Sequence, residues 1–211
     1  MFPYVNWLII LTNIFVFIYQ SGLGYEYNYF IYEYGLVPVR VIKFNSFLPD
    51  VIVPFFSHMF LHGSFFHVFS NLYILFIFGD NIEDRLGHGT YFVMYILFGL
   101  LAGFCQFLFS YDSFLPMIGA SGAVAGVMGA FLVFYPYAKV KTFVFIIIFV
   151  MFVDIPAIFY LLLWLLIQFV NGAVSIGYGS SGVAWWAHIG GFIVGMGCAI
   201  FFKLKEEHSV Q

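Results

Sequence analysis

The sequence predicts an all-α integral membrane protein with six transmembrane helices, and composition is the first reason. Of its 211 residues, 64% are hydrophobic and only 8% are charged, and the mean hydropathy is +1.03. A soluble domain carries about 25% charged residues, so this chain cannot cover itself with a water-soluble surface. The second reason is that uncharged stretches recur at lengths near the ~20 residues that a membrane helix needs.

The same numbers exclude several classes of protein. An apolar chain with so few charges is neither intrinsically disordered nor a coiled coil. The formal net charge of −3 provides no basic face, so we expect no nucleic-acid partner. The two cysteines, Cys105 and Cys198, lie in apolar runs and do not suggest a disulfide framework.

Charged residues mark the limits of the six expected spans, which lie roughly at 4–20, 64–81, 90–110, 119–136, 155–171 and 183–202. The last two divide one uncharged stretch, from Ile155 to Phe202, which is long enough for two helices. We place the division at Asn171-Gly172 and again at Gly177 to Gly182, where small and polar residues interrupt the apolar pattern. These spans make residues 1–211 a single membrane domain.

Two segments fit no span. Residues 21–58 form a long first loop that is rich in tyrosine and phenylalanine, a composition that suits the membrane–water interface. Residues 142–153 are apolar but too short to cross the bilayer. After them, Asp154 and Pro156 resemble a cap and a first-turn proline that open the fifth span.

The basic residues predict the orientation of the chain. If the spans alternate in direction, five of the seven fall on one side: Arg85, Lys139, Lys141, Lys203 and Lys205. The positive-inside rule then places both termini in the cytoplasm. The first span lacks a basic leader and a small-residue cleavage site, so we expect a retained anchor.

Polar residues inside the spans are the candidates for function, because they are costly in a membrane. The second expected span carries His67 and Asn71, and a spacing of four places them about 40° apart on one helical face. A hydrogen-bonded pair that bridges two helices is an equally good interpretation of these two residues alone.

The fourth expected span opens with Gly119-Ala120-Ser121-Gly122. Taken alone, these small residues are more simply explained as a helix-packing face. The alternative makes Ser121 a nucleophile in the first turn of a helix, where the helix dipole and free backbone N–H groups favour negative charge. Gly119, Ala120 and Gly122 would then let a substrate backbone approach closely.

The sixth expected span carries His188, with Gly191 and Gly195 within about 60° of it around the helix. On the fourth span, Ala125 and Gly129 lie within about 80° of Ser121. Two faces of small residues can pack backbone to backbone. Such packing would bring the hydroxyl of Ser121 within hydrogen-bond reach of the imidazole of His188.

The expected depth of these residues in the membrane also indicates that they lie close together. In the predicted orientation the second, fourth and sixth spans start at the outer side, and His67, Ser121 and His188 lie a few residues inside those starts. At about 1.5 Å per residue they share one layer, within ~10 Å of the outer surface. No carboxylate belongs to this layer inside a span, so we predict a Ser–His dyad rather than a triad, with the base oriented by packing.

These residues resemble the rhomboid family of intramembrane serine proteases. The resemblance rests on four motifs in the family's order: Ser57-His58, His62 and His67-x-x-x-Asn71; Ile82 to Gly87; Gly119 to Gly122; and Ala187-His188-x-x-Gly191-x-x-x-Gly195. Together they cover roughly residues 55–200. The resemblance implies a six-helix rhomboid-like bundle with this stretch as its catalytic core, in a plasma (cell inner) membrane, with the active site open to the extracytoplasmic side.

The resemblance also implies a role for each matching residue. Ser121 matches the nucleophile and His188 the general base, while His67, Asn71 and the backbone N–H of Ser121 match the donors to the oxyanion. The residues that match structural support are His58 and His62, near the water-accessible entrance, together with Glu83, Arg85, Gly122, Gly191 and Gly195. Many relatives place an aromatic residue four positions after the serine. Here that position is Ala125, so we expect His188 to be held in another way.

The substrates implied are other membrane proteins, cleaved within or next to a transmembrane helix, with no cofactor and no metal. Three alternative functions predict other features of the sequence. A catalytically silent rhomboid-like binder predicts loss of the serine or the histidine, and both are present. A small transporter predicts charged residues or broken helices at mid-membrane. A metal site at His58, His62 and His67 predicts a nearby carboxylate or cysteine, and the sequence offers neither.

Overall fold

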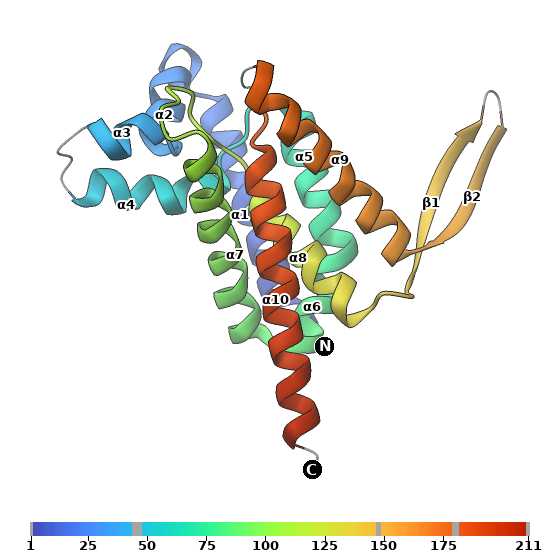
Figure 1. Cartoon of the computed structure of the whole chain (residues 1–211). Helices are drawn as coiled ribbons and strands as arrows, with labels where there is room; N and C mark the ends of the chain where they lie inside the picture. Colours follow the sequence, from blue (N-terminus) through green and yellow to red (C-terminus); the bar gives the residue numbers. More distant parts are fainter. Residues whose placement is uncertain (1, 44–47, 147–148, 179–181, 210–211) are drawn as a thin grey trace.

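The computed structural model describes residues 2–43, 48–146, 149–178 and 182–209, and most of them are helical (Figure 1). The long helices are α1 (Tyr4–Ser21), α7 (His88–Phe109), α9 (Ala157–Tyr178) and α10 (Trp185–Ser209). A further long segment joins α5 (Phe65–Ile74), a π-helical turn η3 (Leu75–Gly79) and α6 (Asp80–Leu86). The beginning of α1 and the end of α10 lie at the same end of the bundle (Figure 1).

Five helical segments in the described residues are long and apolar enough to cross a membrane: Tyr4–Ser21, Phe65–Leu86, His88–Phe109, Ala157–Ile176 and Trp185–His208. The chain is therefore a multi-pass membrane protein. The fourth expected span, 119–136, is the shorter helix α8 (Ser121–Phe134), of 14 residues. Such a helix is about 21 Å long, less than the ~30 Å hydrocarbon core.

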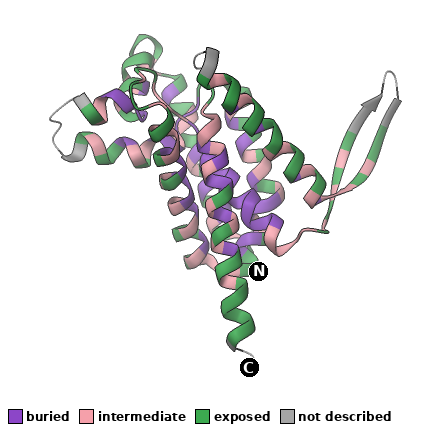
Figure 2. Ribbon diagram, in the orientation of Figure 1, coloured by how far each residue is buried: buried purple, intermediate pink, exposed green. Residues whose placement is uncertain are grey.

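Helix α8 lies in the middle of the bundle, and every residue from Gly122 to Leu132 is buried (Figure 2). Its small residues explain how it fits there. A Cβ atom on Gly191 or Gly195 of α10 would collide with the carbonyl oxygen of Gly122 or Gly126. A Cβ atom on Gly122 would lie 2.6 Å from the Cβ atom of Ala102 on α7. Helix α8 is therefore packed against α7 and α10 at near backbone contact.

One expected break in the fifth span is wrong. Helix α9 continues through Asn171 and Gly172 to Tyr178. The Asn171 amide donates a hydrogen bond to the carbonyl oxygen of Ile167, 2.9 Å away in the preceding turn. The helix itself therefore satisfies this side chain, and Gly172 leaves room for the ring of Trp186. The centre of the second expected break, 179–181, lies outside the described residues.

The first expected loop is largely helical. It contains the short helices η1 (Gly24–Glu26), α2 (Tyr27–Tyr34), α3 (Pro38–Lys43) and α4 (Leu48–Ser57), followed by η2 (His58–Phe60). Leu36 and Met117 exchange two backbone hydrogen bonds, of 3.0 and 2.8 Å. The segment therefore braces the loop that leads into α8. Its position at the membrane interface stays a prediction.

Within the expected non-spanning segment, residues 142–146 and 149–153 belong to an antiparallel pair of strands, which the sequence did not predict. Strand β1 (Lys139–Ile146) pairs with β2 (Phe149–Pro156), in register from Lys139↔Pro156 to Ile146↔Phe149. The strands are rich in valine, isoleucine and phenylalanine, which favour extended backbone. This pair of strands projects from the bundle beside α9 (Figure 1). Pro156 ends β2 rather than opening the helix, which begins at Ala157.

Candidate active site

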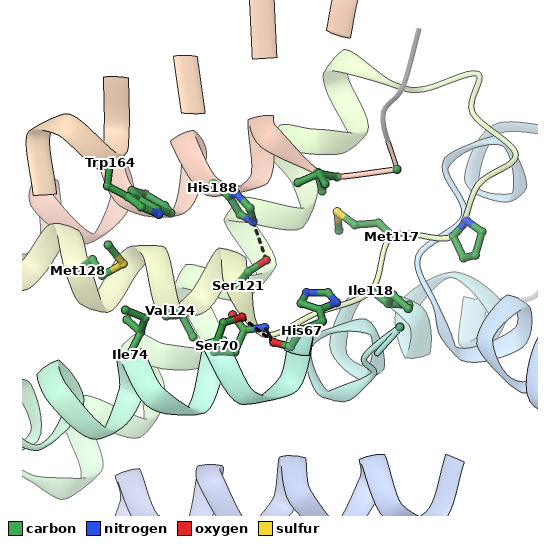
Figure 3. A pocket seen from close by; sticks show the side chains of 16 residues that line it. His67, Ser70, Ile74, Met117, Ile118, Ser121, Val124, Met128, Trp164 and His188 are labelled. Carbon is green, nitrogen blue, oxygen red and sulfur yellow. Dashed lines mark hydrogen bonds between the residues drawn. The ribbon is translucent and has the colours of Figure 1, made fainter. Parts of the chain in front are cut away.

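The hydroxyl of Ser121 and the imidazole of His188 are in direct contact. Ser121 is the first residue of α8 and His188 lies in the first turn of α10. The Oγ atom of Ser121 is 2.7 Å from Nε2 of His188, a hydrogen-bond distance (Figure 3). The two side chains come from positions 67 residues apart, and the close packing of α8 against α10 brings them together.

The loop before Ser121 is fixed by two histidines and one glycine. The N–H of Gly119 donates to the carbonyl oxygen of His58 at 2.8 Å, and the N–H of Ala120 donates to Nε2 of His62 at 3.4 Å. Gly119 has φ +130°, a conformation that favours glycine, and a Cβ atom there would lie 2.7 Å from Nε2 of His67. The local sequence thus determines where α8 begins and where its first hydroxyl lies.

The start of α10 is set by Gln106 of α7. Its Oε1 atom accepts hydrogen bonds from the backbone N–H groups of Trp186 at 3.1 Å and Ala187 at 3.2 Å. These are among the N–H groups that have no partner within a helix. Gln106 therefore satisfies the N-terminus of α10 and fixes the depth of His188, a role that no pattern in the sequence predicts.

Three side chains hold the His188 ring. Its centroid lies 5.8 Å from that of Trp164 on α9 and 6.1 Å from that of Trp185. Its Nδ1 atom is 2.9 Å from Oε1 of Gln168, also on α9. Ala125 is fully buried, and Trp164 and Trp185 supply the aromatic contacts to the ring. The ring is thus held by packing against two aromatic side chains and also by a hydrogen bond to an amide.

His67 and Asn71 of α5 lie on the opposite wall of a cavity of about 430 Å³. Ser64 caps α5 and accepts the N–H of His67 at 3.2 Å. The Asn71 amide donates to the carbonyl oxygen of His67 at 3.1 Å. The cavity is also lined by Ser121 and His188, and by Ile74, Val124, Met128 and Trp164 (Figure 3). Polar groups therefore meet at one end of a mainly apolar cavity.

His58 and His62 are buried and do not line this cavity. The Nδ1 atom of His58 is 2.9 Å from the carbonyl oxygen of Pro54. The backbone of His62 is held by the side chain of Gln20, which both donates to it and accepts from it. These contacts favour structural roles over a place at the entrance. Among the described residues, no three His, Cys, Asp or Glu side chains are arranged to hold a metal ion.

Acid is expected to destabilise the fold through these two histidines. Burial, and then the nearby His67, lowers the pKa of His62 to about 3, and burial lowers the pKa of His58 to about 4. The unfolded chain therefore binds more protons below pH 6.5, and stability is lost as the pH falls from there towards the folded-state values. Between pH 6.5 and 5 each histidine would cost about 2 kcal/mol.

Unfolding in mixed detergent micelles at several pH values measures this loss. The variant His62→Gln keeps an acceptor for the N–H of Ala120 but cannot be protonated, so its stability should fall less steeply with acid. An equal slope for the parent and the variant would show that His62 binds protons equally in the folded and unfolded states, contrary to this prediction.

Glu83 and Arg85 lie away from the cavity, at the end of the bundle where α1 begins. The carboxylate of Glu83 is buried and accepts the backbone N–H groups of Val5 at 2.9 Å and Asn6 at 2.7 Å, so it caps α1. It also contacts Nδ1 of His88. Arg85 forms an exposed ion pair with Glu206. Both side chains therefore connect helices rather than line the cavity.

Helices that could cross a membrane, a serine–histidine pair and an adjoining cavity define a class of protein: multi-pass membrane proteins with a hydrolase-like site. Similarity to known proteins shows which family within this class the chain belongs to. A model of the Rhomboid domain matches residues 49–205. Proteins named rhomboid protease GlpG, from Salmonella newport, Salmonella typhimurium and Salmonella enteritidis, are each 30% identical to the chain over 125 residues.

The aligned segment covers 59% of this chain and 41% of each of those relatives. The family match extends over far more than half of the sequence and includes every residue that lines the cavity. The chain therefore belongs to the rhomboid family.

Proposed function

We propose that this protein is an intramembrane serine endopeptidase that uses Ser121 and His188 as a catalytic dyad. The observation that carries this proposal is the 2.7 Å contact between Oγ of Ser121 and Nε2 of His188 beside an accessible cavity. A serine becomes nucleophilic when an adjacent base can take its proton. Membership of a family with relatives named as proteases supports the same chemistry.

The reaction follows from the positions of these groups. As Oγ of Ser121 attacks the scissile carbonyl carbon, its proton passes to Nε2 of His188. The resulting oxyanion receives hydrogen bonds from His67, from Asn71 and from the backbone N–H of Ser121 at the N-terminus of α8. His188 then gives its proton to the departing amine, and the acyl-enzyme forms. Water attacks this ester in a second round, with His188 again as the base, and releases the acid product.

The proposed substrate is the transmembrane helix of another protein. An intact helix hides its carbonyl groups in its own hydrogen bonds, so the substrate must unwind locally before attack. Residues of poor helix propensity near the scissile bond would lower the cost of unwinding. The largely apolar walls of the cavity suit the side chains of such a segment.

The topology proposed with this function has six spans, with α8 completing the fourth crossing. Residues 1–211 then form one domain with its catalytic core at about 55–200. Both termini lie in the cytoplasm of a cell whose plasma (inner) membrane holds the protein. Ser121 opens to the extracytoplasmic side, from which water reaches the acyl-enzyme.

A labelling experiment tests the proposal directly. The purified protein in detergent is treated with a fluorophosphonate probe, and the modified peptide is located by mass spectrometry. We expect modification at Ser121 and, separately, cleavage of a model transmembrane substrate reconstituted in liposomes. A folded protein that neither reacts with the probe nor cleaves any substrate of a varied panel would be a silent binder.

Removal of one oxyanion donor should slow the chemical step. The variant Asn71→Ala loses a side-chain N–H group, and we expect kcat to fall about a hundredfold, or ~3 kcal/mol, with little change in KM. The matched control is Asn81→Ala, because Asn81 is an exposed asparagine whose amide bonds to its own helix at Ile77. A loss seen mainly in KM, or equally in both variants, would contradict this role for Asn71.

A further inference from the structure

A glutamine on α9 is the only described partner of the second nitrogen of His188. Gln168 is 4% exposed, and its Oε1 atom lies 2.9 Å from Nδ1 of the ring. The two described hydrogen-bond partners of the imidazole, Gln168 and Ser121, are therefore both uncharged. No sequence motif described above includes this glutamine, and the proposed mechanism gives it no role.

The orientation of the Gln168 amide is determined by its own helix. Its Nε2 atom donates a hydrogen bond to the carbonyl oxygen of Trp164, 3.0 Å away in the preceding turn. With the NH2 group engaged there, the amide oxygen faces His188. An amide oxygen can only accept a hydrogen bond. Nδ1 of His188 must therefore carry the hydrogen, and Nε2 keeps the lone pair that receives the proton of Ser121.

We propose that Gln168 is a positioning residue that selects the reactive tautomer of His188. In the opposite tautomer Nε2 carries a hydrogen, and the ring cannot accept a proton from Ser121. A carboxylate fills this position in the well-known serine triads. Here a neutral amide does so, which avoids the cost of burying a charge in a membrane protein. The inference rests on the proposed dyad and adds the source of its orientation.

This arrangement also places the nucleophile, the base and the group that orients the base on three different helices. The nucleophile comes from α8, the base from α10, and the group that orients the base from α9. Trp164, one turn before Gln168, contacts the same ring. The reactivity of Ser121 therefore depends on α9 being seated against α10, as well as on the packing of α8 against α10.

Three variants test the role of Gln168. Gln168→Met has a similar volume but no acceptor, Gln168→Glu keeps an acceptor oxygen at the same place, and Asn171→Leu is the control. Asn171 is an amide on the same helix that makes the same bond to the preceding turn but does not reach His188. We expect kcat to fall about 10- to 100-fold in Gln168→Met with KM unchanged, since a misdirected base slows only the chemical step. Gln168→Glu should return kcat to within a few-fold of the parent, and Asn171→Leu should match the parent.

A spectroscopic measurement separates orientation from general damage. With ¹⁵N-labelled histidine, NMR reports which ring nitrogen of His188 carries the hydrogen, and His188→Ala assigns the signal. We expect the Nδ1–H form in the parent and in Gln168→Glu, and a mixture in Gln168→Met at an unchanged unfolding temperature.

The outcomes separate this inference from the proposed function. If the parent cleaves substrate and Gln168→Met retains its kcat and its tautomer, Gln168 does not position the base. Loss of kcat in Gln168→Met without rescue by Gln168→Glu and without a change of tautomer would equally overturn the inference. Absence of cleavage in the parent itself, with the Nδ1–H form present, would overturn the dyad function and leave the hydrogen bond to Gln168 standing.

Discussion

Replacing Ser121 by alanine is expected to abolish peptide cleavage and leave the protein folded. The variant removes one oxygen atom, whose one hydrogen bond among the described residues is to the His188 ring, while the buried side of α8 is unchanged. Removal of the nucleophile from a serine–histidine site costs about 10⁶-fold in kcat in soluble proteases. We therefore expect cleavage of a transmembrane substrate to fall below detection, and fluorophosphonate labelling to disappear with it.

The companion variant His188→Ala should show a comparable loss of kcat, because a nucleophile without its base is as inactive as a base without its nucleophile. Ser175→Ala provides the matched control, since the Ser175 hydroxyl donates a hydrogen bond to the carbonyl oxygen of Gly172 in its own helix and has no other partner among the described residues. Thermal unfolding in detergent checks that all three variants are folded. Cleavage at the parental rate by Ser121→Ala would end the serine mechanism and move the search to another nucleophile.

The sequence predicts the helical regions well because lipid imposes a simple rule. Charges mark the ends of apolar stretches, and segments near 4–20, 64–81, 90–110 and 183–202 are indeed helical. The rule fails where protein replaces lipid as the surroundings. Helix α8 is short because it starts in the middle of the bundle, and Asn171 does not break α9 because its amide bonds to the preceding turn.

Two separate features of the sequence predict the candidate site. Glycines at helical spacing predict close approach of two helices, and the depths of Ser121 and His188 place their side chains in one layer. The roles of the Gln106 and Gln168 amides could not be predicted, because the periodicity of a helix does not reveal which neighbour a polar side chain will contact. The sequence does indicate that each of them has a partner, because a strongly polar residue within a long apolar helix requires one inside the protein.

Amide side chains recur at the junctions of this bundle. Asn6 donates to the carbonyl oxygen of Leu75 at 3.0 Å, and Gln20 holds the backbone of His62. Gln106 holds the start of α10, and Gln168 holds His188. Lipid tails are as apolar as leucine, so burial of apolar surface does not determine which helices pair. Hydrogen bonds that only one neighbour can satisfy give each of these junctions a specific partner.

Close packing at glycines also determines which helices pair, and a side chain that disrupts it should strongly destabilise the fold. At Gly195 a new Cβ atom would collide with the carbonyl oxygen of Gly126 and lie 2.6 Å from the carbonyl carbon and 2.7 Å from Cα of that residue. These are backbone atoms in the buried part of α8 and cannot rotate away. We expect Gly195→Val to lower the free energy of unfolding by about 3 kcal/mol or more.

The same variant should inactivate any molecules that still fold. Forcing α10 away from α8 lengthens the 2.7 Å contact between Ser121 and His188, and a displacement of about 1 Å can cost a hundredfold in rate. Gly197→Val is the matched control, because a Cβ atom at Gly197 meets nothing within 4 Å on the same helix. Unfolding in mixed micelles and cleavage rates measure both effects. Equal stability and activity of the two variants would mean that α8 and α10 do not meet at Gly195, and the contact between Ser121 and His188 would lose its structural basis.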